Sequence, residues 1–359
     1  MKGRIYNYFP GGNTANGFWS FYRYIINPEE ARRIICIKGG PGTGKSSLMK
    51  KTGLYFIEKG YDVEMHHCSS DNNSLDGIVI KDLKVALIDG TSPHVTDPVF
   101  PGAVDEVLNL GEHWHEQGFQ PSRDKIISIS KKISSYFQST YNYLGAARLM
   151  YEDLESQVAN SMDKYKIAIL EKELIAKILP ESTGKAGSER HLFATAFTPG
   201  GIVTFIQNLT EDYEVIYALN GAPGTGTSEL LNSISSAALK NGFDVEIYHH
   251  PLLPEKTEHI LIPELDTAIV TSNELNNMTF TGSQIYLENY LAAKYDRERN
   301  TTTKKLFNLL TERALELLGN AKELHDELET HYIPNMKFKE LDQVYENTIE
   351  KICRYEKEI

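Results

Sequence analysis

The chain has 359 residues, 41% hydrophobic and 24% charged, a balance typical of a globular protein long enough for two domains. Its net charge of −12 disfavours DNA or RNA as a partner, because most of its surface would repel a polyanion. No apolar run approaches the length that crosses a bilayer, and the N-terminus lacks the core of a signal peptide. With three scattered cysteines as well, we expect a cytoplasmic protein with no membrane segment.

The first predicted elements are a strand, a glycine-rich loop and a helix. The apolar run Ile34-Ile35-Cys36-Ile37 enters the loop, and a helical stretch leaves it from Lys45 to about Glu58. Between them, Gly39-Gly40-Pro41-Gly42-Thr43-Gly44-Lys45-Ser46 matches the Walker A pattern G-x-x-x-x-G-K-[ST] at every fixed position. Backbone amides and the helix N-terminus make such a loop an anion site. We therefore predict that these residues, with Ser47 beside them, bind ATP and Mg²⁺, with Lys45 reaching the β- and γ-phosphates and Ser46 holding the metal.

Two further strands are expected after this helix, from Asp62 to Cys68 and from Lys84 to Asp89. The second has the Walker B form, four apolar residues followed by an acid. Ligands of open parallel sheets gather at the carboxyl ends of the strands. Asp89 is therefore predicted to be the second protein ligand of Mg²⁺ and, with Lys45, a catalytic residue.

Many motor-type ATPases carry a glutamate directly after the Walker B aspartate, but here Gly90 follows. Polar strand-end residues could supply the missing base or bind an acceptor: His66, His67, Ser69, Ser70, Asp71, His94, Asp97 and Asp105. A transition-metal site shared by His66 and Cys68 is an alternative, although residues that line the nucleotide cleft are favoured.

The chain repeats itself. Gly221-Ala222-Pro223-Gly224-Thr225-Gly226-Thr227-Ser228 matches the first loop, and the same offset aligns the segment at Gly60 with that at Gly242. Agreement this long indicates an internal duplication. A polar, glycine-containing linker at 180–188 divides the chain into domains 1–186 and 187–359. In the second copy Thr227 replaces Lys45 and Thr271 replaces Asp89, which predicts a catalytically dead, regulatory copy.

Each copy ends in apolar stripes at helical spacing, from Ile126 to Val158 and from Leu306 to Leu328. We interpret them as long helical hairpins appended to each core, serving as a lid or as a docking arm for a protein partner. A plain covering of the sheet is the alternative. Arginines that could act on the other copy's site are Arg148, Arg190, Arg297 and Arg299.

The paired loops, with His66-His67-Cys68-Ser69-Ser70-Asp71 and Asp89-Gly90-Thr91-Ser92-Pro93-His94, resemble an uncharacterised family of bacterial tandem P-loop proteins, usually labelled ATPase or nucleotide kinase. The fold expected is α/β, with two tandem P-loop NTPase domains that have parallel sheets in three α/β/α layers. The activity expected is ATP hydrolysis in the first copy. The alternatives are a kinase that phosphorylates a small molecule or nucleotide, and a non-enzymatic nucleotide switch that binds a protein.

Overall fold

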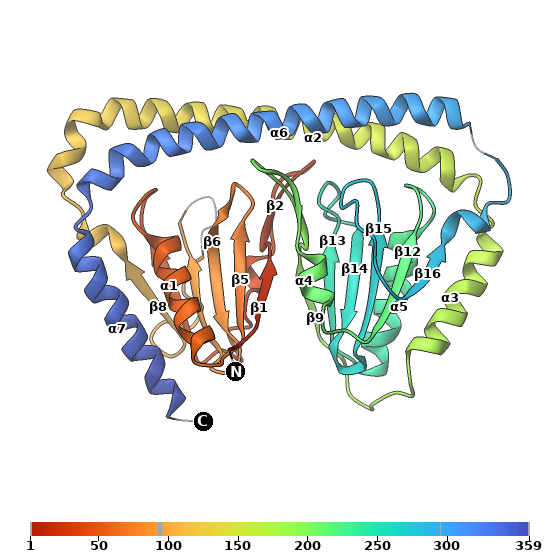
Figure 1. The fold of residues 1–359 in the computed structure, drawn as a ribbon, viewed down its shortest axis with the longest axis horizontal. Helices are drawn as coiled ribbons and strands as arrows, with labels where there is room; N and C mark the ends of the chain where they lie inside the picture. Colours follow the sequence, from red (N-terminus) through yellow and green to blue (C-terminus); the bar gives the residue numbers. More distant parts are fainter. Residues whose placement is uncertain (1, 92–95, 295, 358–359) are drawn as a thin grey trace.

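The structure, a computed structural model, describes residues 2–91, 96–294 and 296–357. Within them the main strands form two six-stranded sheets with the orders β1-β5-β6-β7-β4-β8 and β9-β13-β14-β15-β12-β16 (Figure 1). Matched in chain order, the two arrangements are identical, so the two halves share one fold. The bounds of the first sheet are β1 Ile5–Tyr8, β4 Arg33–Lys38, β5 Val63–Cys68, β6 Asp71–Ile80, β7 Val85–Asp89 and β8 Asp105–Asn109. Those of the second are β9 Glu189–Leu192, β12 Val215–Asn220, β13 Val245–His249, β14 Thr257–Ile262, β15 Thr267–Ser272 and β16 Ser283–Tyr286.

Helices and two hairpins complete each half. The helices are α1 Lys45–Glu58, α2 Arg123–Ala159, α3 Lys164–Ile178, α4 Ile206–Thr210, α5 Thr227–Asn241, α6 Arg297–Tyr332 and α7 Phe338–Glu356. Short 3-10 helices are η1 Tyr22–Tyr24, η2 Leu110–His113, η3 Glu116–Ser122, η4 Pro263–Leu265, η5 Leu287–Tyr290 and η6 Ile333–Asn335. The hairpins are β2 Gly11–Thr14 with β3 Gly17–Ser20, and β10 Thr195–Thr198 with β11 Gly201–Thr204.

The sheets are mixed, so the expectation of parallel sheets is wrong. β6 is antiparallel to β5 and β7, and β14 is antiparallel to β13 and β15, while the remaining pairs are parallel. Only two residues separate β5 from β6 and four separate β6 from β7. Connections this short can join only antiparallel neighbours.

The expected three α/β/α layers are also wrong, because only one face of each sheet carries long helices. On the first sheet, Met49 and Phe56 of α1 pack on one face. The other face is covered by the segment that precedes β4, through Tyr22 of η1, Ile25 and Ala31. In the second half the corresponding segment includes the short helix α4.

The two halves exchange their last helices. α3, from the first half, buries Leu170, Leu174 and Ile178 in the core of the second sheet. α7, from the second half, buries Ile349 and Ile352 in the core of the first sheet. The boundary between 186 and 187 therefore separates the two sequence copies but not the two hydrophobic cores.

The expected helical hairpins are not formed, because α2 and α6 are single long helices that pair with each other. α2 continues through Gly145 for 37 residues, about 55 Å at 1.5 Å per residue. A single glycine costs a helix only about 1 kcal/mol relative to alanine and does not by itself turn the chain. Leu144 and Ala147 of α2 pack with Phe307 and Ala314 of α6. In Figure 1 the pair lies across the top of both sheets.

The sheets meet edge to edge beneath these helices. Phe9, after β1, and Phe193, after β9, exchange two backbone hydrogen bonds of 3.0 Å. Both phenyl rings are fully buried in a cluster shared by the two halves. Across the described residues, no helix has the length and apolarity to cross a bilayer.

Candidate functional site

The first glycine-rich loop connects the carboxyl end of β4 to the N-terminus of α1. Gly42 and Gly44 have φ angles of 65° and 89°, in the left-handed region that favours glycine. α1 begins at Lys45, and the N–H groups of its first turn have no acceptors within the helix. Ser46 is half-buried and Ser47 is exposed. The strand, loop and helix predicted around Gly39–Ser46 are therefore present.

Lys45 and Asp89, predicted to share one site, lie side by side. Lys45 Nζ donates to the carbonyl oxygens of Gly39 and Gly40, both at 2.9 Å, and lies 3.6 Å from Asp89 Oδ2. The two side chains are 12% and 14% exposed. The lysine charge is thus held against its own loop and partly balanced by the carboxylate.

The position of Asp89 follows from the sheet. β7 is the direct parallel neighbour of β4, with Asp89 opposite Ile37. Thr91 joins Asp89 to the loop, because its N–H donates to Asp89 Oδ1 and its hydroxyl donates to the Gly39 carbonyl, both at 2.9 Å. The end of β7 is therefore fixed to the glycine-rich loop through one threonine.

Asp76 is a residue of this site that sequence reasoning missed. Gly77 pairs with Ile88 in the antiparallel register of β6 and β7, which places Asp76 opposite Asp89. Opposite residues of such a pair project to the same face. Asp76 is 5% exposed, and Tyr22 OH donates to its Oδ2 at 2.5 Å. Burial, with a smaller contribution from the charge of Asp89, raises the pKa of Asp76 to about 7.

A signal for Asp76 was present in the sequence. It is an acidic residue within the run Leu75–Ile80, which is otherwise apolar apart from Gly77. Because the sequence pattern does not show that this segment pairs with β7, nothing in it connected Asp76 to Asp89.

The two histidines proposed as bases are engaged at the junction of the two halves. His66 Nε2 lies 3.1 Å from Glu64 Oε2, and His67 contacts Asn7 Oδ1 and the Asn72 carbonyl. Burial lowers the pKa of both imidazoles, that of His67 to about 4. Both side chains are therefore held in structural contacts.

The remaining strand-end candidates are also engaged. Asp97 pairs with Lys38, and Asp105 accepts hydrogen bonds from two backbone N–H groups of its own loop. Asp71 accepts from Ser74. Ser69 is buried, and Ser70 follows it in the turn between β5 and β6. His94 lies outside the described residues.

The alternative of a transition-metal site at His66 and Cys68 gains no support from the geometry. The His66 ring is turned towards Glu64, and Cys68 is buried with a pKa raised by that burial. In the part of the chain that the structure describes, no three His, Cys, Asp or Glu side chains are grouped to hold a metal ion.

The end of α6, from the second half, covers the first loop. A Cβ atom added to Gly40 would lie 2.7 Å from Tyr332 Cε1, and one on Gly42 would lie 3.0 Å from Ile333 Cγ1. A Cβ atom added to Gly44 would lie 3.5 Å from Cδ1 of Leu341 in α7. The first loop is therefore in contact with α6, η6 and α7, which follow the second glycine-rich loop in the chain.

The second loop repeats this arrangement with the halves reversed. Gly224 and Gly226 both have φ of 89°, and α5 begins at Thr227. A Cβ atom on Gly224 would lie 2.1 Å from the carbonyl oxygen of Glu155, near the end of α2. Thr271, at the Asp89 position, donates its hydroxyl hydrogen to the Glu258 carbonyl.

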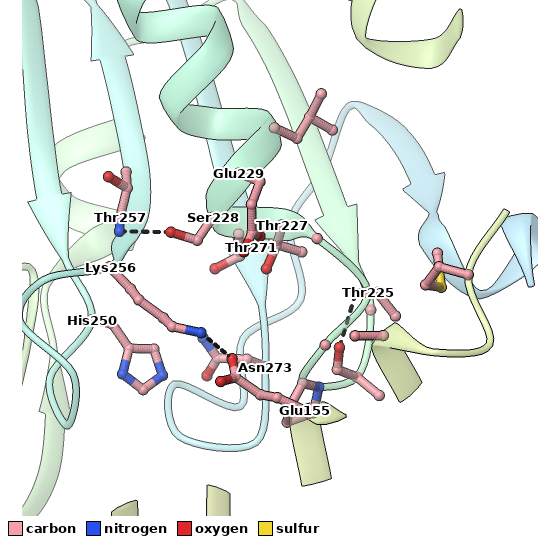
Figure 2. A pocket seen from close by; sticks show the side chains of 18 of the residues that line it. Glu155, Thr225, Thr227, Ser228, Glu229, His250, Lys256, Thr257, Thr271 and Asn273 are labelled. Atoms are coloured by element: carbon pink, nitrogen blue, oxygen red, sulfur yellow. Dashed lines mark hydrogen bonds and ion pairs between the residues drawn. The ribbon is translucent and has the colours of Figure 1, made fainter. Parts of the chain in front are cut away.

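A cavity of about 520 Å³ adjoins the second loop. Figure 2 shows side chains from four parts of the chain around it: Glu155 of α2, Thr227 and Ser228 of α5, His250 and Lys256 between β13 and β14, and Thr271 with Asn273 at the end of β15. Lys256 Nζ donates to Glu155 Oε1 at 2.5 Å. The second half thus has a cavity with polar walls.

The arginines considered for action across the halves are paired elsewhere. Arg190 donates to both carboxylate oxygens of Glu64, at 2.9 and 2.6 Å. Arg148 pairs with Glu152 and Glu255, and Arg299 with Asp153. The side chain of Arg297 lies outside the described part of the chain.

Comparisons with protein-family models, curated proteins and solved structures find no match to this chain. The functional argument therefore rests on the geometry of the site itself.

Proposed function

We propose that the first half binds a nucleoside triphosphate with Mg²⁺ at Gly39–Ser46 and hydrolyses its γ-phosphate. One observation carries this proposal. Lys45 of the loop with the Walker A pattern lies beside Asp89, at the end of the neighbouring parallel strand β7, with Nζ 3.6 Å from Oδ2. A phosphate at the loop would draw Lys45 from the carbonyl oxygens it now contacts, because the ammonium group is attracted more strongly by an anion than by a neutral carbonyl.

The side chains around Lys45 suit Mg²⁺, which prefers oxygen ligands and keeps several waters. Asp89 and the Ser46 hydroxyl would hold it, and Asp89 Oδ2 lies 3.6 Å from Lys45 Nζ. The metal would neutralise charge on the phosphate oxygens as the terminal bond breaks.

Asp76 is the group we assign as proton acceptor for the attacking water. A base acts best when its pKa is near the working pH, and that of Asp76 is about 7. Attack of the water oxygen on the γ-phosphorus would release the nucleoside diphosphate and transfer a proton to this carboxylate. Asp76 would thereby take the role of the glutamate that is missing after Asp89.

The test is phosphate release from Mg²⁺·ATP and Mg²⁺·GTP by the purified full chain, without added acceptor. We expect Lys45→Ala to lower the rate by about 10²- to 10³-fold, the usual effect of removing one transition-state donor. Lys51→Ala is the matched control, since it removes the same side chain from an exposed position of the same helix. It should leave the rate unchanged.

Equilibrium binding of the nucleotide separates the alternatives. Binding that is lost in Lys45→Ala, but without phosphate release by the wild type, would keep the site and replace hydrolysis by an acceptor-dependent kinase or a switch. Equal release by wild type and Lys45→Ala would refute the proposal, because another site or a contaminant would then be responsible.

A further inference from the structure

The second half lacks the lysine of the phosphate loop but has gained one nearby. Thr257 N–H donates to Ser228 Oγ at 3.0 Å, as Leu75 N–H donates to Ser46 Oγ at 3.0 Å in the first half. Lys256 precedes Thr257, whereas Ser74 precedes Leu75. The first half therefore has its lysine at the start of α1, whereas the second half has one in the connection between β13 and β14, directly before β14.

His250 adds a hydrogen-bond donor to the same cavity. Its Nδ1 accepts from the N–H groups of Leu252 and Leu253, at 3.3 and 3.2 Å, so the ring proton resides on Nε2. His250 is 5% exposed, and no described residue accepts a hydrogen bond from Nε2. The ring is also packed against Tyr151, with centroids 5.1 Å apart, which holds its direction. Buried donors are normally satisfied, and His250 lines the cavity, so a ligand oxygen bound there would supply the acceptor that Nε2 lacks.

Part of the acidic charge around the cavity is compensated within the protein. Glu258 Oε1 accepts from Asn273 and Asn276, whereas Oε2, 3.4 Å from His259 Nε2, accepts no hydrogen bond from a described residue. Glu152 pairs with Arg148. Glu229 is exposed in the first turn of α5, where water screens its charge.

Glu155 is the acid that competes most directly for Lys256. It accepts from Lys256 Nζ at 2.5 Å, and burial raises its pKa. An entering anion would therefore share Lys256 with a carboxylate whose charged form is already disfavoured.

We propose that this second cavity binds a phosphate group without a divalent cation, through the first-turn amides of α5, His250 Nε2–H and Lys256 Nζ. Helix N-terminal amides bind anions, and here a cation and a neutral donor join them from a separate part of the chain. Thr271 supplies no carboxylate for Mg²⁺, so the ligand is bound and not hydrolysed. A volume of about 520 Å³ also admits a group larger than phosphate itself.

The test uses the full chain with Lys45→Ala, which weakens the first loop, and the second-cavity variants described below assign the binding to its loop, so the result does not depend on the function proposed for the first loop. Equilibrium dialysis in EDTA measures binding of radiolabelled inorganic phosphate, AMP and ATP in separate arms. We expect saturable binding of one phosphate group per chain. Binding of inorganic phosphate with competition by AMP identifies a free phosphate or phosphomonoester site, and binding of nucleotides alone identifies a nucleotide-phosphate site; both support the proposal.

Lys256→Ser and His250→Cys, which install the residues of the first half, should each raise the dissociation constant by about tenfold or more, the range expected for a hydrogen bond to a charged group. Lys240→Ser is the control, because it removes an equal charge from the exposed end of α5, at the opposite end of the helix from the glycine-rich loop. Glu155→Gln should tighten binding about fivefold by releasing Lys256, an effect that damage to the fold would not produce. No saturable binding in any arm, or binding indifferent to Lys256→Ser and Glu155→Gln, would overturn the proposal.

Discussion

Replacing Asp76 by asparagine should stabilise the protein increasingly as the pH rises. The carboxyl is buried opposite Asp89, with its pKa raised from an ordinary 3.8 to about 7. Between these values the folded state keeps the Asp76 proton while the unfolded chain releases it. Stability therefore falls with rising pH in this window, and the asparagine variant lacks this loss.

The size of the effect follows from the two pKa values. Keeping Asp76 buried costs the folded state roughly 2 kcal/mol at pH 5 and roughly 4 kcal/mol at pH 8, relative to a side chain that does not ionise. The difference in unfolding free energy between Asp76→Asn and wild type should thus grow by about 2 to 3 kcal/mol over this range. Any constant effect of the amide, including its bond with Tyr22, cancels in that comparison.

The assay is urea unfolding of both proteins at pH 5 and pH 8 in EDTA. Asp82→Asn is a suitable control, since Asp82 is an exposed acid in the turn that follows the same strand. A stability difference that stays the same at both pH values would refute the assignment of a poised carboxyl to Asp76. Phosphate release by Asp76→Asn should in addition fall by about 10²-fold or more if this carboxylate is the base.

Three further predictions test other parts of the molecule. Removal of Mg²⁺ by EDTA, or Asp89→Ala, should each abolish phosphate release, and release that persists in EDTA would contradict a role for the metal. Arg190→Met should cost about 3 to 5 kcal/mol of stability at pH 7, because it leaves the buried Glu64 carboxylate without its cationic partner. The loss should be smaller at pH 4, where Glu64 of the variant takes up a proton and loses its charge. Chemical unfolding measures the loss at both pH values, and an equal loss would contradict this. In α7, Ile352→Ala should lower the free energy of unfolding by about 2 to 5 kcal/mol, because Ile352 is buried in the first core. The control is Leu309→Ala in α6, which is 62% exposed and should change that free energy by less than about 0.5 kcal/mol. Similar losses in urea unfolding would argue against α7 as part of the first core.

The position of the two glycine-rich loops illustrates what local pattern can predict. Gly42, Gly44 and their counterparts have backbone angles that glycine adopts readily, and an apolar run before them and a helical stretch after them are sufficient to place β4 and α1. Asp89 was found for a similar reason, since an acid after four apolar residues marks the end of a buried strand.

Strand direction and helix pairing could not be obtained in this way. The apolar segment at Ile78–Ile80 suits a strand of either direction, and only the short connections on both sides of β6 make it antiparallel. The stripes along α2 predict an apolar partner without naming it, so a hairpin within one copy and a pair between copies fit equally well.

The sequence by itself thus determined the duplication, the geometry of the glycine-rich loops and the loss of Lys45 and Asp89 equivalents in the second copy, because each depends on residues close together in the chain. The tertiary structure decided which distant parts of the chain lie together: Asp76 beside Asp89, α7 in the first core, and Lys256 near the second glycine-rich loop. Such contacts depend on register and on the exchange of helices between the halves, and both are set by the joint burial of surfaces that lie far apart in sequence.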